Sequence, residues 1–245
     1  MCQGIGIDAV VCDLDTQPII DHAQFQDAEI YYFAPPPKTA LDDPRLAYFL
    51  DAVKSAPKKI VLISTTGVYG DCRGEWIDET QPLNPSTDRA KRRVAAEATL
   101  NEWAERYAKP YIILRVPGIY ALDRLPTARL NKQLPVVQAS EAAFTNRIHA
   151  DDLATICLEA MRSPLVAEVF NATDGDPGTM VEYFNCIADY AGIERPRQIS
   201  LEQAKTELSA GMLSYAAESR RIGNAKLLKL LGIKLKHPTL KSTLN

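Results

Sequence analysis

The amino-acid sequence predicts an α/β protein, with a parallel sheet flanked by helices and a small mixed cap after it. Short apolar runs alternate with longer amphipathic stretches in the first half of the chain, which is typical of βαβ units. The runs at 59–64 and 111–115 are almost continuously apolar, as expected for parallel strands that are covered on both faces. We therefore predict a body over residues 1–120 and a cap over residues 121–245 that is intertwined with it.

The first elements follow from local composition. An apolar, partly β-branched run predicts a strand at 5–12, and a short helix is expected at 17–25. The next strand, at 29–34, must end at the three prolines 35–37, because proline has no N–H to donate to a sheet. A helix over 42–56 begins with an early proline, a position where the missing N–H is tolerated.

Helical periodicity predicts the remaining elements, and it loosens after residue 121. A long helix is expected over 86–107, between the two most apolar strands. The later elements are expected to be a short strand at 168–171 and helices at 151–161, 179–191, 201–208 and 224–231.

Composition narrows the classes of function. The formal net charge of −3 argues against a nucleic-acid-binding surface. The five cysteines form no CxxC pair and the three histidines lack ligand spacing, so we expect neither a disulfide framework nor a metal site. Together with the absence of a signal-like segment and of an apolar run of roughly 18 residues, this predicts a cytoplasmic protein without a membrane partner.

Four segments carry more specific patterns. Residues 64–70 read Ser-Thr-Thr-Gly-Val-Tyr-Gly, 114–120 read Leu-Arg-Val-Pro-Gly-Ile-Tyr, and 146–154 contain Arg-Ile-His-Ala-Asp-Asp-Leu-Ala. A fourth segment, 218–232, contains Glu-Ser-Arg-Arg and a later Leu-Gly. In order and spacing they resemble the extended short-chain dehydrogenase/reductase superfamily, in an atypical branch that is NAD-dependent epimerase/dehydratase-like.

The resemblance implies a Rossmann-like fold, NAD or NADP as cofactor and a small-molecule substrate such as a nucleotide sugar. It places Thr65 where the superfamily has the Ser or Thr that hydrogen-bonds the reacting oxygen, a role that needs a group able to donate and accept. Its neighbours Ser64 and Thr66 are then expected to contact cofactor and substrate, respectively. Capping of the strand end by these hydroxyls is the alternative.

The superfamily's catalytic Tyr and Lys have no counterpart here. With Pro85 and Glu97 setting the register, Arg89 takes the Tyr position and Arg93 takes the Lys position. Arginine stays charged and does not transfer protons at ordinary pH. The resemblance leaves Arg93 as a candidate to hold a ribose hydroxyl or phosphate, and Arg89 as a candidate for an anionic substrate. A solvated helix face is the alternative for both.

Further binding residues are implied by the resemblance. Arg147 borders the expected substrate pocket and is a candidate for anion binding. Asp13 has the alternative of being a plain helix cap. The implied cofactor contacts at strand ends are Asp13, Leu14, Ala34, Pro35, Pro36 and Pro117.

The glycine-rich phosphate loop of dinucleotide-binding folds is not found. Gly4-Ile5-Gly6 precedes a predicted strand, whereas the loop must lie between a strand and a helix. The resemblance starts at the third strand, so the sheet is expected to be incomplete at its N-terminal strands and the chain to be truncated. We hypothesise that 5–12 pairs beside 29–34, whose apolar edge would otherwise be open. A misplaced start, a shortened gene or strands donated by a partner are the alternatives.

Three functions remain open. The first is an NAD(P)-dependent oxidoreductase or epimerase with impaired catalysis. The second is a non-catalytic protein of the same fold that binds or senses a small molecule or nucleotide, and the third is an inactive fragment. A homodimer through the long helices is expected by analogy alone.

Overall fold

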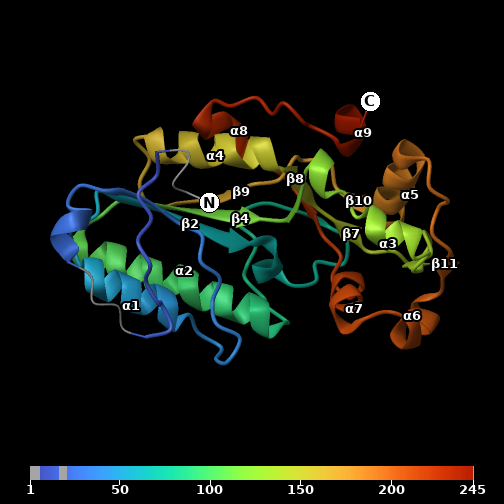
Figure 1. Cartoon of the computed structure of the whole chain (residues 1–245), viewed down its shortest axis with the longest axis horizontal. Helices are drawn as coiled ribbons and strands as arrows, with labels where there is room; N and C mark the ends of the chain where they lie inside the picture. Colours follow the sequence, from blue (N-terminus) through green and yellow to red (C-terminus); the bar gives the residue numbers. More distant parts are fainter. Residues whose placement is uncertain (1–5, 17–20, 245) are drawn as a thin grey trace.

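The computed structural model describes residues 6–16 and 21–244, and a four-stranded parallel sheet lies at its centre (Figure 1). The strands are β1 (Glu29–Tyr32), β2 (Lys59–Thr65), β4 (Tyr111–Val116) and β9 (Glu168–Asn171), in that order. All three neighbouring pairs are parallel. The predicted α/β body with a parallel sheet is therefore confirmed.

Helices cover both faces of this sheet (Figure 1). On one face lie α1 (Pro44–Val53) and α2 (Asp88–Tyr107), and on the other lie α4 (Ala150–Arg162) and α8 (Ala225–Leu231). Alternate residues of β2 and β4 enter the two resulting cores, because successive side chains of a strand point to opposite faces. Burial on both faces is what made these strands read as continuous apolar runs.

Local sequence explains where the helices begin and end. The Asp43 carboxylate accepts the Leu46 N–H at the start of α1, where proline occupies the first turn. α5 (Met180–Ala191) begins with a capping box between Thr179 and Glu182 and ends at Gly192, whose φ of 63° suits glycine. Apart from the one expected at 17–25, the predicted helices are confirmed to within a few residues at each end.

Short elements make up the rest of the described chain. α7 (Ala210–Ala216), which carries residues of the site described below, was not expected from the sequence. The other helices are α3 (Thr127–Asn131), α6 (Leu201–Glu207) and α9 (Leu240–Leu244), with 3-10 turns η1 (His22–Phe25), η2 (Thr66–Tyr69) and η3 (Leu122–Arg124). Besides the central sheet, the described chain has four two-stranded sheets. Three are parallel: β3 (Trp76–Ile77) with β12 (Arg221–Ile222), β5 (Gly118–Tyr120) with β8 (Arg147–His149), and β6 (Val136–Val137) with β11 (Gln198–Ile199). The fourth, β7 (Phe144–Thr145) with β10 (Gly178–Thr179), is antiparallel.

The expected strand at 5–12 is wrong. Residues 6–12 form no strand, and Val10 and Val11 are 83% and 101% exposed. Within the described ranges, β1 pairs with β2 alone, so the hypothesis that this segment lies beside β1 fails. An apolar β-branched run becomes a strand only where a neighbour and a buried face receive it. The expected helix at 17–25 is reduced to η1, and residues 17–20 lie outside the described part.

The described helices include none that is both long and apolar enough to cross a membrane.

Candidate functional site

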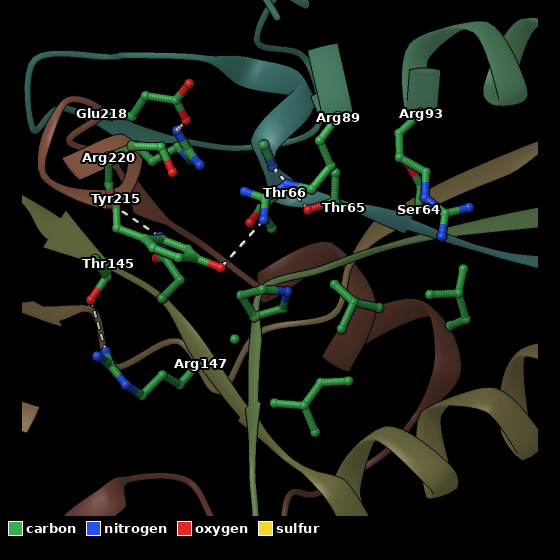
Figure 2. Close-up of a pocket in the computed structure, with 18 of the residues that line it drawn as sticks. Ser64, Thr65, Thr66, Arg89, Arg93, Thr145, Arg147, Tyr215, Glu218 and Arg220 are labelled. Carbon is green, nitrogen blue, oxygen red and sulfur yellow. Dashed lines mark hydrogen bonds and ion pairs between the residues drawn. The ribbon is translucent and has the colours of Figure 1, made fainter. Parts of the chain in front are cut away.

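A cavity of about 700 Å³ lies at the carboxyl ends of β2 and β4 (Figure 2). One wall comes from the β2–η2 junction, the first turns of α2 and the segment after β4. The other comes from β7, β8, α5, α7 and the segment after α7. Ligands of open parallel sheets bind beyond the carboxyl ends of the strands, so this is the position where a site is expected.

Most of the residues predicted from the sequence meet in this cavity. The predicted residues that line it are Pro35, Pro36, Ser64, Thr65, Thr66, Arg89, Arg93, Pro117 and Arg147. Asp13, Leu14 and Ala34 do not line it. The Asp13 side chain caps the turn that follows it, accepting the Asp15 N–H at 2.9 Å, whereas Leu14 and Ala34 pack against the core under α1 and α2.

The segment that contains Asp13 and Leu14 nevertheless lies near the cavity rim. The Arg45 guanidinium donates to both carboxylate oxygens of Asp15, at 2.6 and 2.7 Å. The same guanidinium donates to the Pro35 carbonyl at 2.9 Å. Arg45 thus joins the two segments that the resemblance assigned to the adenosine side of the cofactor, and their role in binding stays a prediction.

The hydroxyl groups after β2 have separate partners. Ser64 is buried, and its Oγ donates to Glu97 Oε1 at 2.5 Å. Thr65 Oγ1 accepts the Gly67 N–H at 3.3 Å and so caps η2. Capping uses Thr65 as an acceptor, which leaves its hydroxyl hydrogen free to point toward a ligand.

A buried ion-pair network supports the cavity floor. Arg115 donates to Glu97 from two nitrogens, at 3.2 and 2.7 Å. Its third nitrogen donates to the Tyr69 hydroxyl at 2.9 Å, and that hydroxyl donates to Asn171 Oδ1 at 2.7 Å. The network therefore links Ser64 in β2 to α2, β4 and β9 through groups that all lie in the protein interior.

Positive charge dominates the cavity lining. The basic lining residues are Lys38, Arg89, Arg92, Arg93, Arg147 and Arg220, and the acidic ones are Asp88 and Glu218. Arg220 and Glu218 form an ion pair at 2.7 Å, so they offset each other. The remaining excess of guanidinium groups favours a ligand that carries negative charge.

Arg93 has a donor without a partner. Its Nη1 is buried and has no hydrogen bond within the described chain. Burial lowers the pKa of the Arg93 guanidinium, since the surroundings disfavour its charge. A buried, unsatisfied donor is costly to the fold, so a ligand acceptor such as a ribose hydroxyl or a phosphate oxygen fits this position.

Arg147 is the most deeply enclosed cation of the site. It donates to Thr145 Oγ1 at 2.8 Å and to the Met180 sulfur at 3.2 Å, and its guanidinium lies 3.8 Å from the centre of the Tyr183 ring. Burial lowers its pKa. These hydrogen-bond and ring partners are uncharged, and the buried Asp174 carboxyl is an acidic group that interacts with the Arg147 charge. The guanidinium has no ion pair among the described residues, so an anionic ligand can supply one.

The cap adds residues that sequence reasoning missed. Figure 2 shows Tyr215 of α7 in the cavity with its hydroxyl toward Arg89, which donates to it at 3.4 Å. Tyr183 and Phe144 also line the cavity. Arg220, in the segment 218–232 that carries the resemblance, is partly buried and donates to the Gly70 carbonyl. No spacing rule in the sequence marks these residues, because they come from separate short elements.

The buried carboxyl of Asp174, close to Arg147, has a pKa well above the usual value for an aspartate. Asp174 is 7% exposed, and burial raises its pKa to about 7. The folded protein therefore holds a proton that the unfolded chain releases above about pH 4. Stability falls as pH rises from there toward 7, and it stays reduced at higher pH.

Asp174→Asn is expected to remove this fall in stability with pH, because the amide does not ionise. Its oxygen can still accept the Asp176 N–H that Asp174 Oδ1 accepts at 3.0 Å. The advantage of the variant in free energy of unfolding should widen by roughly 3 kcal/mol between pH 5 and pH 8. Urea unfolding of both proteins at the two pH values measures it. A difference that does not change with pH would contradict the expectation.

Comparison with known proteins gives one family and several similar structures. The model of the family described as "NAD dependent epimerase/dehydratase family" matches residues 46–172. The dTDP-D-glucose 4,6-dehydratase of Mus musculus is 25% identical over 128 residues, which is 49% of this chain and 36% of that protein. The Homo sapiens protein of the same name is 25% identical over 122 residues, 46% of this chain and 35% of that protein. The chain thus spans little more than a third of these curated relatives.

Solved structures are similar over more of the chain. A functionally unknown conserved protein from Silicibacter pomeroyi has a TM-score of 0.77 and 27% identity, over 88% of this chain and 75% of that one. The UDP-glucose 4-epimerase of Thermotoga maritima, solved with UDP-glucose, has a TM-score of 0.72 and 19% identity, over 88% of this chain and 74% of that one. These similarities agree with the Rossmann-like arrangement of sheet and helices.

Proposed function

Because the chain belongs to the NAD-dependent epimerase/dehydratase family, we propose that its cavity binds a nucleotide-type anion, either a nucleotide sugar or a nicotinamide dinucleotide, and that turnover of the family type is impaired. The observation that carries the proposal is the buried Arg93 Nη1, which has no hydrogen-bond partner among the described residues, in a cavity with excess positive charge at the carboxyl ends of the strands. Phosphate groups satisfy such donors in pairs. A body over 1–120 and a cap over 121–245, both lining the cavity, remain part of the proposal.

Impaired turnover follows from the residues at the start of α2. A proton-transferring phenol with a neighbouring lysine is replaced by Arg89 and Arg93, and arginine does not release its proton at ordinary pH. Among the described residues, Tyr215 is the tyrosine whose hydroxyl accepts a hydrogen bond from Arg89. It is the group on which any remaining proton transfer to a bound hydroxyl would depend.

The described residues provide some, but not all, of the contacts that a dinucleotide cofactor of this family would need. A dinucleotide, when bound, supplies hydride transfer. The Arg93 donor and the hydroxyls of Thr65 and Thr66 fit its ribose or phosphate groups. A glycine turn between a strand and a helix, which would hold the pyrophosphate, is not found in residues 6–16 and 21–244. We therefore assign the chain's own residues to binding and derive no hydride step.

Calorimetric titration with NAD(H), NADP(H) and UDP-glucose tests the proposal. We expect micromolar binding of at least one of them, weakened roughly tenfold or more by Arg93→Met. Thermal unfolding of the ligand-free proteins shows whether the variant folds, because the buried Asp43 carboxyl also interacts with the Arg93 charge. Arg162→Met, at the exposed end of α4, is the matched control and should bind as the wild type does.

Two results would overturn parts of the proposal. An absence of binding at millimolar ligand would remove the binding function. Steady conversion of UDP-glucose in the presence of NAD would overturn the impairment.

A further inference from the structure

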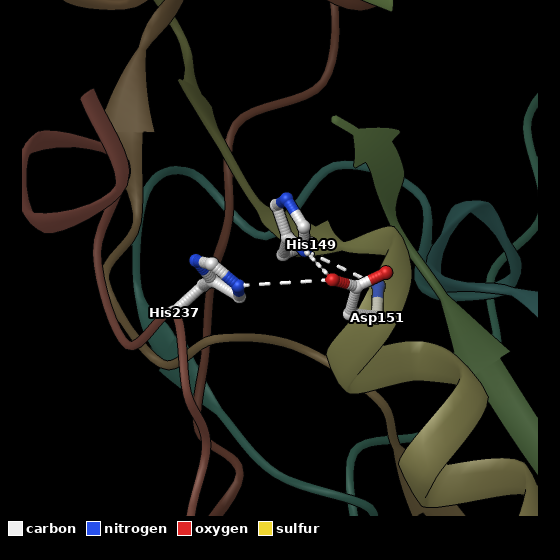
Figure 3. A group of neighbouring side chains, drawn as sticks. All are labelled: His149, Asp151 and His237. Carbon is white, nitrogen blue, oxygen red and sulfur yellow. Dashed lines mark hydrogen bonds and ion pairs between the residues drawn. The ribbon is translucent and has the colours of Figure 1, made fainter. Parts of the chain in front are cut away.

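A second polar cluster lies behind the cavity wall, where the C-terminal segment crosses the start of α4 (Figure 3). His149 ends β8 and caps α4, Asp151 lies in the first turn of α4, and His237 comes from the segment after α8. One ligand atom from each residue lies within 4.8 Å of the other two. The nitrogens His149 Nδ1 and His237 Nε2 are each 4.0 Å from Asp151 Oδ2.

The two imidazoles are arranged so that both nitrogens face the same carboxylate. The rings are stacked, with centroids 3.7 Å apart and planes 27° from parallel. Figure 3 shows one nitrogen of each ring pointing toward Asp151. The lone pair of an imidazole nitrogen lies in the ring plane, so one of the two stacked rings must turn for both nitrogens to bind the same ion.

Other contacts hold these residues in place independently. Asp152, 1% exposed, accepts the N–H groups of Lys236 and His237 at 2.8 Å each and so fixes the C-terminal segment to α4. His237 Nδ1 lies 3.2 Å from Thr243 Oγ1. Metal-binding histidines usually donate their other ring N–H to such an oxygen, which orients the ligating nitrogen.

We propose that His149 Nδ1, His237 Nε2 and the Asp151 carboxylate form a Zn²⁺ site. Two imidazoles and a carboxylate are a donor set that zinc takes at about 2.0–2.2 Å, with water as a fourth ligand in an open site. The Asp151 side chain is 72% exposed, which leaves room for that water and for the carboxylate to move inward. His149 Nδ1 then exchanges its present hydrogen bond from the Asp151 N–H, at 3.2 Å, for the metal.

The charges around the proposed zinc position do not exclude a cation. A helix N-terminus alone repels a cation. Here Asp151 and Asp152 both lie in the first turn of α4 and offset that repulsion. The cluster also differs from a patch of acidic groups, because two of its three donors are imidazoles fixed by neighbouring contacts.

Zinc at this position would join distant parts of the chain. His149 and Asp151 lie at the start of α4 and His237 lies in the segment after α8, so the metal would close a long loop in the unfolded chain and stabilise the folded one. The Tyr120 ring lies edge-on to His149 at 5.2 Å, and its hydroxyl lies 3.2 Å from Thr243 Oγ1. Since Tyr120 lines the cavity, the metal would also hold that wall.

Titration of the untagged, chelator-treated full chain with Zn²⁺ tests the site, with free metal followed by a chromophoric chelator. We expect one zinc per chain with a micromolar or lower Kd and a rise in the thermal midpoint. Co²⁺ in place of zinc should give visible bands of a four-coordinate nitrogen and oxygen site, without thiolate charge transfer.

His237→Gln should weaken Zn²⁺ binding at least tenfold, and Asp151→Asn should also weaken it. His22→Gln is the matched control, because His22 lies at the far end of the body in an exposed 3-10 turn. Absence of binding at 100 µM zinc, or equal binding by the wild type and the His237→Gln variant, would overturn the site. Circular dichroism of the metal-free variants shows whether they fold, and a folded His237→Gln variant with unchanged affinity is decisive against it.

Discussion

Arg147→Met is expected to weaken binding of the anionic ligand by roughly 10- to 150-fold, the equivalent of the 1.5–3 kcal/mol of a hydrogen bond to a charged group. Arg147 is the most enclosed cation of the cavity, and its hydrogen-bond and ring partners are uncharged. Methionine can still pack against Tyr183 and Met180, so the fold should tolerate the change. Calorimetric titration with the ligand that the wild-type chain binds measures the effect.

Arg129→Met supplies the matched control for that measurement. Arg129 also places its guanidinium over an aromatic ring, at 5.2 Å from the centre of Phe184, and burial also lowers its pKa. It does not line the cavity. Equal losses of affinity in the two variants would mean that the effect comes from disturbed packing of the cap. Unchanged affinity in Arg147→Met would remove Arg147 from the site.

Arg115→Met should lower the free energy of unfolding by about 3–5 kcal/mol. The side chain is buried and donates two hydrogen bonds to Glu97 and one to Tyr69. Its removal leaves the Glu97 carboxylate charged in the interior with Ser64 as its remaining partner. Urea unfolding at neutral pH measures the loss, provided that the slope of the transition does not change.

An exposed ion pair of similar geometry serves as the control for the buried pair of Arg115 and Glu97. Arg195 donates to both carboxylate oxygens of Asp189, at 2.8 and 2.7 Å, but both side chains are more than half exposed. Arg195→Met should therefore lower the free energy of unfolding by less than about 1 kcal/mol. The double variant Glu97→Met with Arg115→Met should recover part of the loss, because no buried charge is left alone. Similar losses in Arg115→Met and Arg195→Met would contradict this account.

The body could be predicted from the sequence because its strands and helices carry their own signals. Strands β2 and β4 bury both faces and read as apolar runs, and α1 and α2 begin at recognisable caps. The run at 5–12 carries a similar apolar signal but forms no strand in residues 6–12, which are exposed. What separates these cases is the presence of a neighbouring strand, and local composition does not encode it.

Some residues of the candidate site could likewise be predicted from the sequence, and others could not. Thr65, Arg93 and Pro117 follow strand ends or begin a long helix, and parallel strands bring such positions to one edge. Tyr215 lies on a seven-residue helix whose place depends on packing against residues far away in the chain. Likewise, His149 and His237 show no ligand spacing, and they meet because Asp152 holds the C-terminal segment.

The cavity takes one wall from β2, α2 and the segment after β4, and the other from β7, β8, α5 and α7, so a ligand bound there would contact elements that are far apart in the chain. The free energy of binding then also stabilises the packing of these elements against one another, and a ligand at a hundred times its Kd adds about 2.7 kcal/mol to the free energy of unfolding. Proteases attack chains through their opened states. The lifetime of this protein in a cell should therefore follow the supply of its ligand, so that its abundance reports on the pool of that molecule even without turnover.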